Sequence, residues 1–347
     1  MPRKSRGKGQ IVGRLRFPAR ASVVTVTGLT LLVTGCTSTK SGGSGGGSQS
    51  GGKVTVGLVT KTNSNPYFVK LRDSAKAEAD KRGAKLIPLA GKFDGDNQGQ
   101  VDAINNLVAQ NVAGILITPS NSSGVLGAIK AARAKGIVVI ALDTATEPAD
   151  AVDATIATDN TAAGVSQGKY VKAALGKRKP ALVMLDGTPG STVNTQRHSG
   201  FLKGFGLKDG SPGIKGTAVT NGDQTKAQTA MENLYQRDRD VNSVYTLNEP
   251  AAAGASEALG GKKSVVIGSI DGSCAGVRNV RSGKFAATVM QFPKKMAQLG
   301  VDAVIDYAKD KKKPSGFIDT GSQLITDKPQ PGLESKDTAW GLKNCWG

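Results

Sequence analysis

Short apolar runs alternate with amphipathic stretches along the chain from Lys53 onward. Apolar runs of strand length occur at 54–59, 85–89, 114–117 and 138–142. Between them, apolar residues recur with helical spacing at 69–82, 98–110 and 124–135. Strands that alternate with helices are typical of a parallel sheet covered by helices. This part of the chain therefore predicts an α/β lobe.

A second series of the same kind follows the run 154–157 and the polar residues 158–160. It predicts strands at 181–185, 217–220, 243–246, 265–267 and 286–289, with helices between them. An amphipathic helix at 294–309, a turn at 311–314 and a late strand at 321–325 complete the pattern. We therefore predict an α/β protein with two similar, doubly wound parallel-sheet lobes.

The net charge of +19 raises the question of a nucleic-acid partner. Seven of the cations precede Cys36 with no acidic residue among them, so the rest of the chain carries +12. The remaining Lys and Arg residues are scattered, for example at Lys76, Lys81 and Lys85, and form no block. We interpret them as a solvated surface and expect no nucleic-acid partner.

The first 36 residues have the parts of an export signal: a basic stretch, an apolar stretch at 21–33 and the small residues Thr34 and Gly35. The apolar stretch is too short to span a bilayer comfortably. The ending Val33-Thr34-Gly35-Cys36 resembles the lipobox of bacterial lipoproteins, which implies a signal peptide at 1–36 and a lipid anchor at Cys36. The alternative is a free or buried cysteine. The Gly/Ser-rich residues 37–52 predict a flexible tether.

Two further cysteines, Cys274 and Cys345, remain in the body of the chain. An even pair outside the cytoplasm favours a disulfide, which would attach the tail "LKNCWG" to the body. Two free buried thiols are the alternative. The chain has a single histidine and these cysteines lie far apart in sequence, so we expect no metal site.

Polar side chains follow the predicted strands, at the edge where ligands of open parallel sheets bind. Each of them alone is compatible with a helix cap or a turn. Together they predict a polar cleft. The polar residues that follow the strands are Asn63, Asn65, Asp143, Arg197, Asn248, Glu249, Asp271 and Gln291.

This set suits the chemistry of a sugar, whose hydroxyl groups donate and accept hydrogen bonds on a ring with apolar C–H faces. Carboxylates accept hydrogen bonds, Arg donates in a rigid fork, and Asn and Gln do both. Tyr67 or Phe68 can cover the C–H face. A capping role for Asn63 or Asn65, with Pro66 early in the helix and an aromatic residue in the core, is the alternative for this turn.

The motifs in order resemble those of bacterial periplasmic sugar-binding proteins of the ribose-binding type, which are components of ABC importers. The resemblance covers 53–347 and is carried by "NPYF", "ALDT", "QRHSGF", "TLNEPAAAGA", "SIDGSCAG" and "ATVMQFP". Within that family, "GKFDGDN", "ILITPSNSSG", "TAMENLYQ" and the ending "NCWG" look most like the fructose-binding members. By position it implies the ligand-binding residues Asn65, Tyr67, Phe68, Asp143, Arg197, Asn248, Asp271 and Gln291.

The resemblance also implies how the chain is organised and what it does. Three crossings near 158–160, 291–293 and 325–328 would join a lobe of residues 53–158 and 293–325 to a lobe of residues 159–292 and 326–347. Hinge closure would trap a monosaccharide and present it to an ABC permease. We expect an extracytoplasmic monomer, lipid-anchored to the outer face of the cell membrane, without a cofactor.

The chain departs from the ribose-binding pattern at two positions. Thr144 stands where those members have an Arg, and the aromatic residue of their second lobe falls near Gly222. Both changes predict a pocket of different shape. They disfavour ribose, and fructose rests on the resemblance alone.

Other functions stay open at this point. The ligand can be another hexose, a polyol or a signalling furanose. A repressor-type regulator shares the fold but begins with a helix-turn-helix instead of an export signal. A sugar-processing enzyme could use the carboxylates of Asp143 and Asp271. His198 is the single histidine of the chain, and we expect it to be a surface or capping residue.

The loop "KFDGDNQG" resembles a calcium-binding loop but lacks its later glutamate ligand, so we expect Asp96 or Asn97 to cap the next helix.

Overall fold

The computed structural model describes residues 53–347. The predicted signal peptide, the tether and Cys36 lie outside the described residues. Within the described range, no helix is both long enough and apolar enough to cross a membrane.

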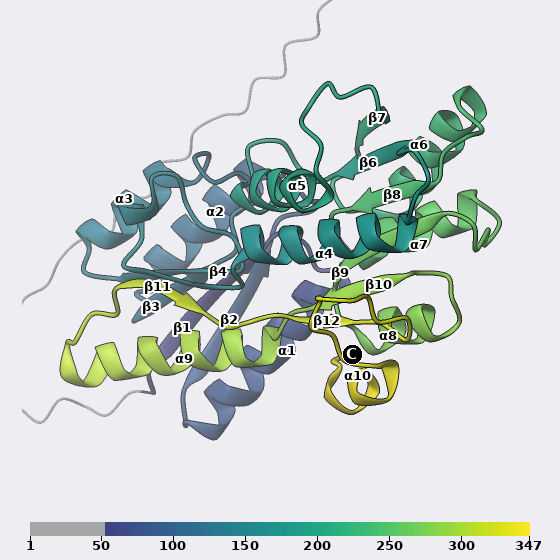
Figure 1. Ribbon diagram of the computed structural model, residues 1–347. Helices are drawn as coiled ribbons and strands as arrows, with labels where there is room; N and C mark the ends of the chain where they lie inside the picture. The colour runs from purple at the N-terminus through teal and green to yellow at the C-terminus, as the bar shows by residue number, and fades with distance from the viewer. Residues whose placement is uncertain (1–52) are drawn as a thin grey trace, which may run out of the picture. The chain divides into compact units, whose positions relative to one another are not determined.

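The first lobe is built on a parallel sheet with the strand order β11-β5-β4-β3-β1-β2 (Figure 1). Its strands are β1 (Thr55–Thr60), β2 (Lys85–Ala90), β3 (Gly114–Ile117), β4 (Val138–Leu142), β5 (Ala154–Ala157) and β11 (Gly316–Asp319). Its helices are α1 (Pro66–Lys81), α2 (Asn97–Ala109), α3 (Leu126–Ala134) and α9 (Pro293–Asp310), with a short 3-10 turn at Ala149–Ala151.

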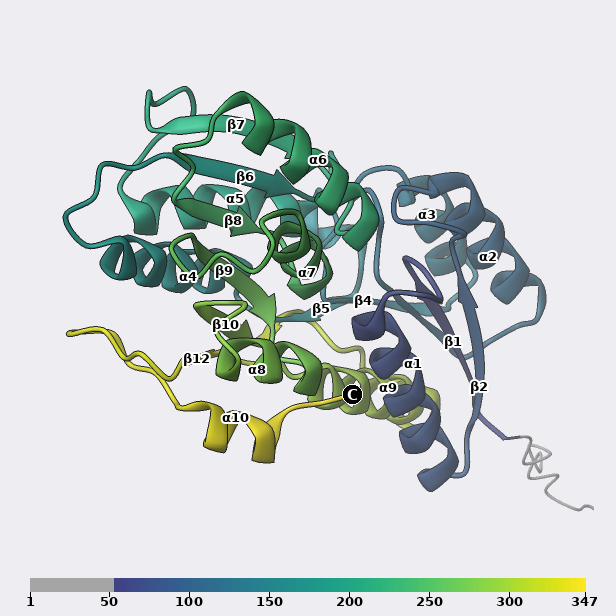
Figure 2. The ribbon, with the colours of Figure 1, turned by 90° about the vertical axis from the view of Figure 1, so that its right-hand side faces the viewer.

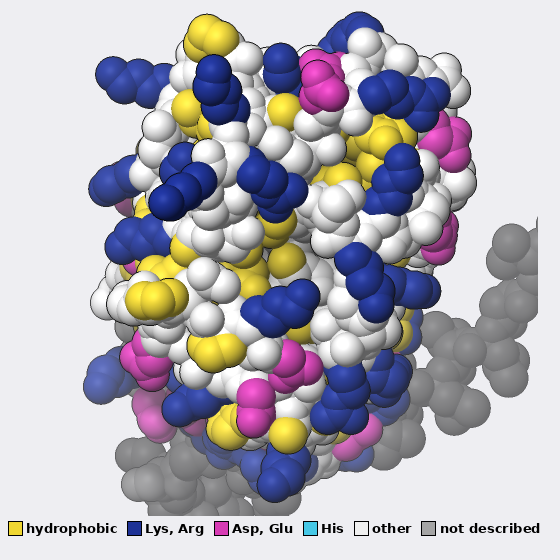
Figure 3. Space-filling view, turned by 45° about the vertical axis from the view of Figure 1, so that its right-hand side comes forward, with side chains coloured by type: hydrophobic (Ala, Val, Ile, Leu, Met, Phe, Trp, Pro, Cys, Tyr) yellow, Lys and Arg dark blue, Asp and Glu magenta, His cyan; other side chains and the backbone are white. Residues whose placement is uncertain are grey.

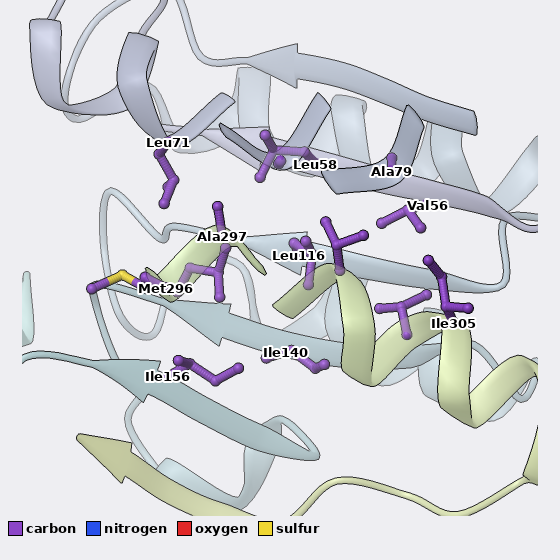
Figure 4. Close-up of a cluster of buried hydrophobic side chains, with 14 of the residues drawn as sticks. Val56, Leu58, Leu71, Ala79, Leu116, Ile140, Ile156, Met296, Ala297 and Ile305 are labelled. Atoms are coloured by element: carbon purple, nitrogen blue, oxygen red, sulfur yellow. The ribbon is translucent and has the colours of Figure 1, made fainter. Parts of the chain in front are cut away.

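Both faces of the central strands are buried, which explains why β3 and β4 are continuous apolar runs. Along β4, Val138, Ile140 and Leu142 pack in one cluster with residues of α1 and α9, shown in Figure 4. Val139 and Ala141 point the opposite way and pack with α2 and α3. The alternation follows from the two-residue period of a strand.

The second lobe repeats this plan with the strand order β12-β10-β9-β8-β6-β7. Its strands are β6 (Leu182–Asp186), β7 (Ile214–Val219), β8 (Ser243–Thr246), β9 (Val266–Asp271), β10 (Ala287–Met290) and β12 (Gln323–Ile325). Its helices are α4 (Asn160–Leu175), α5 (Thr192–Phe205), α6 (Gln224–Arg237), α7 (Glu249–Ala258), α8 (Cys274–Arg281) and α10 (Thr338–Asn344). Figure 2 shows the second lobe beside the first. In the first lobe, α1 and α9 lie side by side. The predicted fold class of two α/β lobes is confirmed.

The chain passes between the two sheets at three places, after β5, after β10 and after β11. The third crossing lies at 320–322, earlier than the 325–328 that the sequence suggests. The residues 323–325 form β12, which pairs antiparallel with β10 through Thr288 and Ile325 and therefore belongs to the second sheet. Leu324 and Ile325 are buried there, so the apolar signal of the predicted strand at 321–325 was correct and its assignment to the first lobe was wrong.

Two elements have no counterpart in the sequence prediction. Strand β11 lies at the edge of the first sheet, and all four of its residues are exposed, so it carries no apolar pattern. Helix α10 has only seven residues and is capped by Asp337, which accepts from the Trp340 amide at 2.7 Å.

Lys and Arg side chains are spread over the face drawn in Figure 3, between patches of uncharged surface. This distribution agrees with the interpretation of the basic residues as a solvated surface.

Candidate functional site

Four of the predicted ligand-binding residues lie at the carboxyl ends of strands. Asp143 follows β4, Asn248 follows β8, Asp271 ends β9 and Gln291 follows β10. Each is 7% exposed or less. They come from both sheets, so the edge predicted to hold a ligand contains polar groups from the two lobes.

Arg197 connects this set from α5. Its Nε donates to Asn160 Oδ1 at 2.8 Å, and its two terminal nitrogens donate to the Leu247 carbonyl at 3.0 Å and to Gln291 Oε1 at 2.9 Å. The guanidinium also lies 4.0 Å from Asp143 Oδ1. Asn160, which the sequence analysis did not select, therefore helps to fix the direction of the guanidinium fork.

Close packing of α4 on α5 makes the Arg197–Asn160 contact possible. A Cβ atom on Gly164 would lie 2.5 Å from the Arg197 carbonyl oxygen, and one on Gly200 would lie 2.5 Å from the Thr161 carbonyl oxygen. The absence of side chains at these two positions lets the helix backbones touch.

Asp271 is the most strongly constrained acid of the set. One carboxylate oxygen accepts from the Gln291 amide at 3.1 Å, and the other accepts from the Glu249 backbone N–H at 3.2 Å. Burial raises the pKa of Asp271 well above its usual value, and the charge of Glu249 raises it further. The cause is the removal of the carboxylate from water, which disfavours its ionised form.

Asp143 is held by its neighbours in the same turn. Its backbone is left-handed, with φ 62°, and its Oδ2 accepts from the Thr144 hydroxyl at 2.9 Å. Its carbonyl oxygen accepts from the Asn160 amide at 3.3 Å. Thr144, one of the two departures from the ribose-binding pattern, thus orients the neighbouring carboxylate.

Tyr67 and Phe68 lie at the start of α1 and form a buried aromatic cluster with Trp346. The Tyr67 and Phe68 rings are 5.6 Å apart and nearly perpendicular. The Tyr67 hydroxyl donates to Met296 Sδ at 3.6 Å. Burial raises the pKa of Tyr67 well above its usual value, and the charge of Asp143 adds to the increase.

Asn65 and Asn248 both act as helix caps. Asn65 Oδ1 accepts from the Tyr67 N–H at 2.9 Å, and Asn248 Oδ1 accepts from the Ala251 N–H at 3.0 Å. The capping interpretation of the first turn is therefore correct for Asn65. Capping uses the side-chain oxygen of Asn65, so its amide N–H₂ is the part that a ligand could contact.

A cavity of about 370 Å³ adjoins the Asn65 cap, and both lobes line it. Its volume falls within the range of about 300–1,000 Å³ that is typical of small-molecule sites. The residues that line it include Asn65, Lys92, Asp94, Gly222 and Gln224.

Gly222 has no room for a side chain. Its φ is +66°, and a Cβ atom would lie 2.5 Å from Asn248 Nδ2. That amide donates to the Gly222 carbonyl at 3.1 Å. The backbone of Gly222 thus lies close to the Asn248 side chain, and a side chain at position 222 would clash with it.

Glu249, which the sequence analysis placed among the residues of the polar cleft, lies directly behind Asp271. Its carboxylate accepts from the backbone N–H groups of Gly272 at 2.9 Å and Ser273 at 3.1 Å, from the Ser273 hydroxyl, and from the Thr288 hydroxyl at 2.8 Å. Burial raises its pKa to about 7, although these hydrogen bonds counteract the increase. Glu249 therefore shapes the turn that carries Asp271 instead of facing the cleft.

The loop 188–192 of the second lobe contacts the first lobe at several points. Thr188 donates to Asp94 at 2.8 Å, and Lys61 donates to Ser191 at 3.3 Å. The Ser122 hydroxyl contacts the Thr192 hydroxyl at 3.1 Å. These polar contacts join the two lobes beside the cleft.

His198 contacts no predicted ligand-binding residue. Its ring nitrogens lie 2.8 Å from Asp186 and 2.9 Å from Asp209. Hydrogen bonding to Asp186 raises its pKa to about 9.

In the loop "KFDGDNQG", Asp96 caps α2 by accepting from the Gly99 N–H at 3.0 Å, which confirms the capping prediction. Among residues 53–347, no cluster of three or more potential metal-ligating side chains occurs.

The two remaining cysteines come together at the end of the chain. The Sγ atoms of Cys274 and Cys345 lie at bonding distance, and the Cα atoms are 4.9 Å apart. The Cys274 N–H also donates to the Trp346 carbonyl at 2.9 Å. The tail is thus attached next to the Asp271 turn.

Comparison with known proteins places this arrangement in a family. The family model described as a periplasmic binding protein domain matches residues 56–313. The chain belongs to the periplasmic binding protein family. The similar proteins reported below are named as binding proteins and not as enzymes.

Similar proteins fit this assignment over most of their length. The ribose import binding protein RbsB of Bacillus subtilis is 33% identical over 269 residues, which is 76% of this chain and 86% of the relative. The galactofuranose-binding protein YtfQ of Escherichia coli is 29% identical over 82% of this chain and 91% of the relative. An ABC transporter solute-binding protein from Mycobacterium smegmatis, solved with bound glycerol, is 28% identical with a TM-score of 0.72, covering 79% of this chain and 94% of that one.

Proposed function

We propose that this chain is the extracytoplasmic substrate-binding component of an ABC-type sugar importer and captures a monosaccharide between its lobes. The ligand contacts are Asn65, Tyr67, Phe68, Asp143, Arg197, Asn248, Asp271 and Gln291. Hinge closure brings the two halves of this set together around the sugar.

The observation that carries the proposal is the mixed polar set at the facing strand ends. Asp143 and Asp271 bring one carboxylate from each lobe, and both are at most 4% exposed. Arg197 lies between them and donates to Gln291. Buried carboxylates, a guanidinium and amides beside Tyr67 provide both acceptors and donors for hydroxyl groups, together with an aromatic surface for C–H groups.

Fructose is the favoured ligand, on the resemblance of several motifs to fructose-binding members. The relatives are named for ribose and galactofuranose, so a furanose or another hexose is the alternative. Thr144 supports a ligand other than ribose. Ribose-binding members have an Arg at this position, whereas here the Thr144 hydroxyl donates to the Asp143 carboxylate.

The proposal includes the setting in which the protein works. A lipid at Cys36 attaches the chain to the outer face of the cell membrane, and residues 37–52 act as a tether that keeps the monomer near its permease. The contact between Cys274 and Cys345 becomes a disulfide in this oxidising environment, and its geometry supports that state.

A calorimetric titration tests the proposal. The full-length protein is titrated with fructose, ribose, glucose, galactose, galactofuranose and myo-inositol, alongside Asp271→Ala and a control, Asp240→Ala, which removes an exposed acid of the second lobe. We expect one sugar to bind with a Kd of roughly micromolar or lower. Asp271→Ala should abolish this binding, whereas Asp240→Ala should leave it unchanged.

Absence of binding across the panel would exclude a simple-sugar receptor. Binding of galactofuranose or myo-inositol without fructose would retain the transport role and replace the favoured ligand.

A further inference from the structure

The side chain of Trp346 lies between the two lobes. It is 6% exposed and packs with Tyr67 and Phe68 of the first lobe. Its ring centroid lies 5.6 Å from that of Tyr67, with the ring planes 75° apart. Its indole N–H donates to the Asp271 carbonyl at 3.0 Å. One side chain of the tail therefore touches a binding residue in each lobe.

The contact with Asp271 matters because of the backbone at that residue. Asp271 has φ 151°, a value that residues other than glycine rarely adopt. Such a conformation persists only where its surroundings hold it. The Asp271 carbonyl accepts two hydrogen bonds, one from the Gln291 backbone N–H at 2.8 Å and one from Trp346. Trp346 is thus one of two donors that hold the turn in which the Asp271 carboxylate points to Gln291.

The tail that carries Trp346 is fixed to the same turn. Ser273 pairs with Trp346 as an isolated parallel bridge, and the Cys274 N–H donates to the Trp346 carbonyl at 2.9 Å. The Cys274 and Cys345 sulfurs lie at bonding distance. Each of these attachments lies within three residues of Asp271, so the position of the indole depends on them.

We propose that Trp346 is a positioning residue for ligand capture. It holds the backbone of Asp271 through its indole N–H and the ring of Tyr67 through an edge-to-face contact, while the bond between Cys274 and Cys345 fixes it in place. The inference rests on the proposed function and adds a role in binding for the last residues of the chain.

The test uses the full-length protein and two single substitutions in the tail. Trp346→Phe keeps an aromatic ring and removes the N–H donor. Trp340→Phe is the matched control, because Trp340 lies in α10 and contacts none of the ligand-binding residues. Trp346→Phe should weaken sugar binding by roughly fivefold to tenfold. Its melting temperature should stay close to that of the wild-type protein, and Trp340→Phe should bind normally.

Fluorescence gives a second readout, since the chain has two tryptophans. In Trp340→Phe the remaining emission comes from Trp346, and sugar addition should change it. In Trp346→Phe the remaining emission comes from Trp340, and sugar addition should leave it unchanged. The double variant Cys274→Ser with Cys345→Ser should weaken binding in the same direction as Trp346→Phe.

Hydrogen exchange decides the inference without any ligand. If Trp346 holds the Asp271 carbonyl, the Gln291 amide that shares this acceptor should exchange faster in Trp346→Phe than in the wild-type protein. Equal exchange at Gln291, or equal sugar affinity of the two proteins, overturns the inference. Failure of every sugar to bind the wild-type protein overturns the proposed function, and the exchange rate at Gln291 still shows whether Trp346 holds Asp271.

Discussion

Arg197 donates a hydrogen bond to the side-chain oxygen of Gln291 at 2.9 Å. The amide nitrogen of Gln291 then donates to Asp271 at 3.1 Å. Gln291 follows β10, directly before the chain crosses to α9 of the first lobe. Arg197 is thus connected to the residue that precedes the crossing between the lobes. We therefore expect a ligand that rearranges Arg197 to act on this crossing.

Arg197→Lys should weaken sugar binding and lower stability. Lysine keeps the charge but cannot reach Asn160, Gln291 and the Leu247 carbonyl at once. Each lost hydrogen bond involves a charged donor, so we expect the Kd to rise roughly 10- to 100-fold. Titration calorimetry of the variant measures the change. An unchanged Kd would show that the guanidinium geometry is not used in binding.

Gly200→Ala should disturb the same residue through the backbone. The added Cβ atom would lie 2.5 Å from the Thr161 carbonyl, so α5, which carries Arg197, has to move away from α4. We expect a loss of about 1–3 kcal/mol in the free energy of unfolding, together with weaker binding. Gly127→Ala is the control, because Gly127 lies in α3 with no atom within 4 Å of the added Cβ, and this change should be neutral or stabilising. Denaturant unfolding of both variants tests the contrast, and equal effects would contradict the packing argument.

The folded protein should lose stability between about pH 6.5 and pH 9 because of His198. Hydrogen bonding to Asp186 raises the folded-state pKa of His198 to about 9, whereas the unfolded value is about 6.5. The contribution of the protonated histidine is therefore complete below about pH 6.5 and disappears as the pH rises to about 9. Melting temperatures across this range measure the slope. His198→Gln should flatten the slope, and an identical slope in the variant would assign it to other groups.

Glu249→Gln should destabilise the Asp271 turn. The Glu249 carboxylate accepts four hydrogen bonds from donors in Gly272, Ser273 and Thr288, and an amide group would turn a nitrogen toward some of them. Leaving such buried donors unpaired costs about 1–3 kcal/mol. Chemical denaturation should show this loss, while the exposed control Glu334→Gln should match the wild-type protein. A Glu249→Gln protein as stable as the control would mean that the turn is held by other contacts.

The sequence predicts the buried parts of this protein well, for reasons that are physical. Strands β3 and β4 are fully buried, and each is an uninterrupted run without a polar side chain. The ligand-binding candidates were found because they follow such runs, where parallel strands present their ends. Strand β11 was missed because its exposed residues carry no pattern.

Long-range contacts account for the rest of what the sequence did not reveal. Trp346 reaches Tyr67 and Asp271 only because the tail folds back, and no local pattern encodes that path. Asn160 looked like part of a crossing segment, yet the close packing of α4 on α5 places it on Arg197. The third crossing was placed too late because an apolar strand does not indicate which sheet it joins.

The most direct test of the account is a double-mutant cycle on the two carboxylates, one from each lobe. Asp143→Asn, Asp271→Asn and the double variant are titrated calorimetrically with the sugar that binds the wild-type protein. If the sugar bridges both lobes, each single substitution should weaken binding roughly tenfold or more, and the double variant should depart from additivity. A normal Kd in either single variant would place the ligand on one lobe alone and contradict capture by hinge closure.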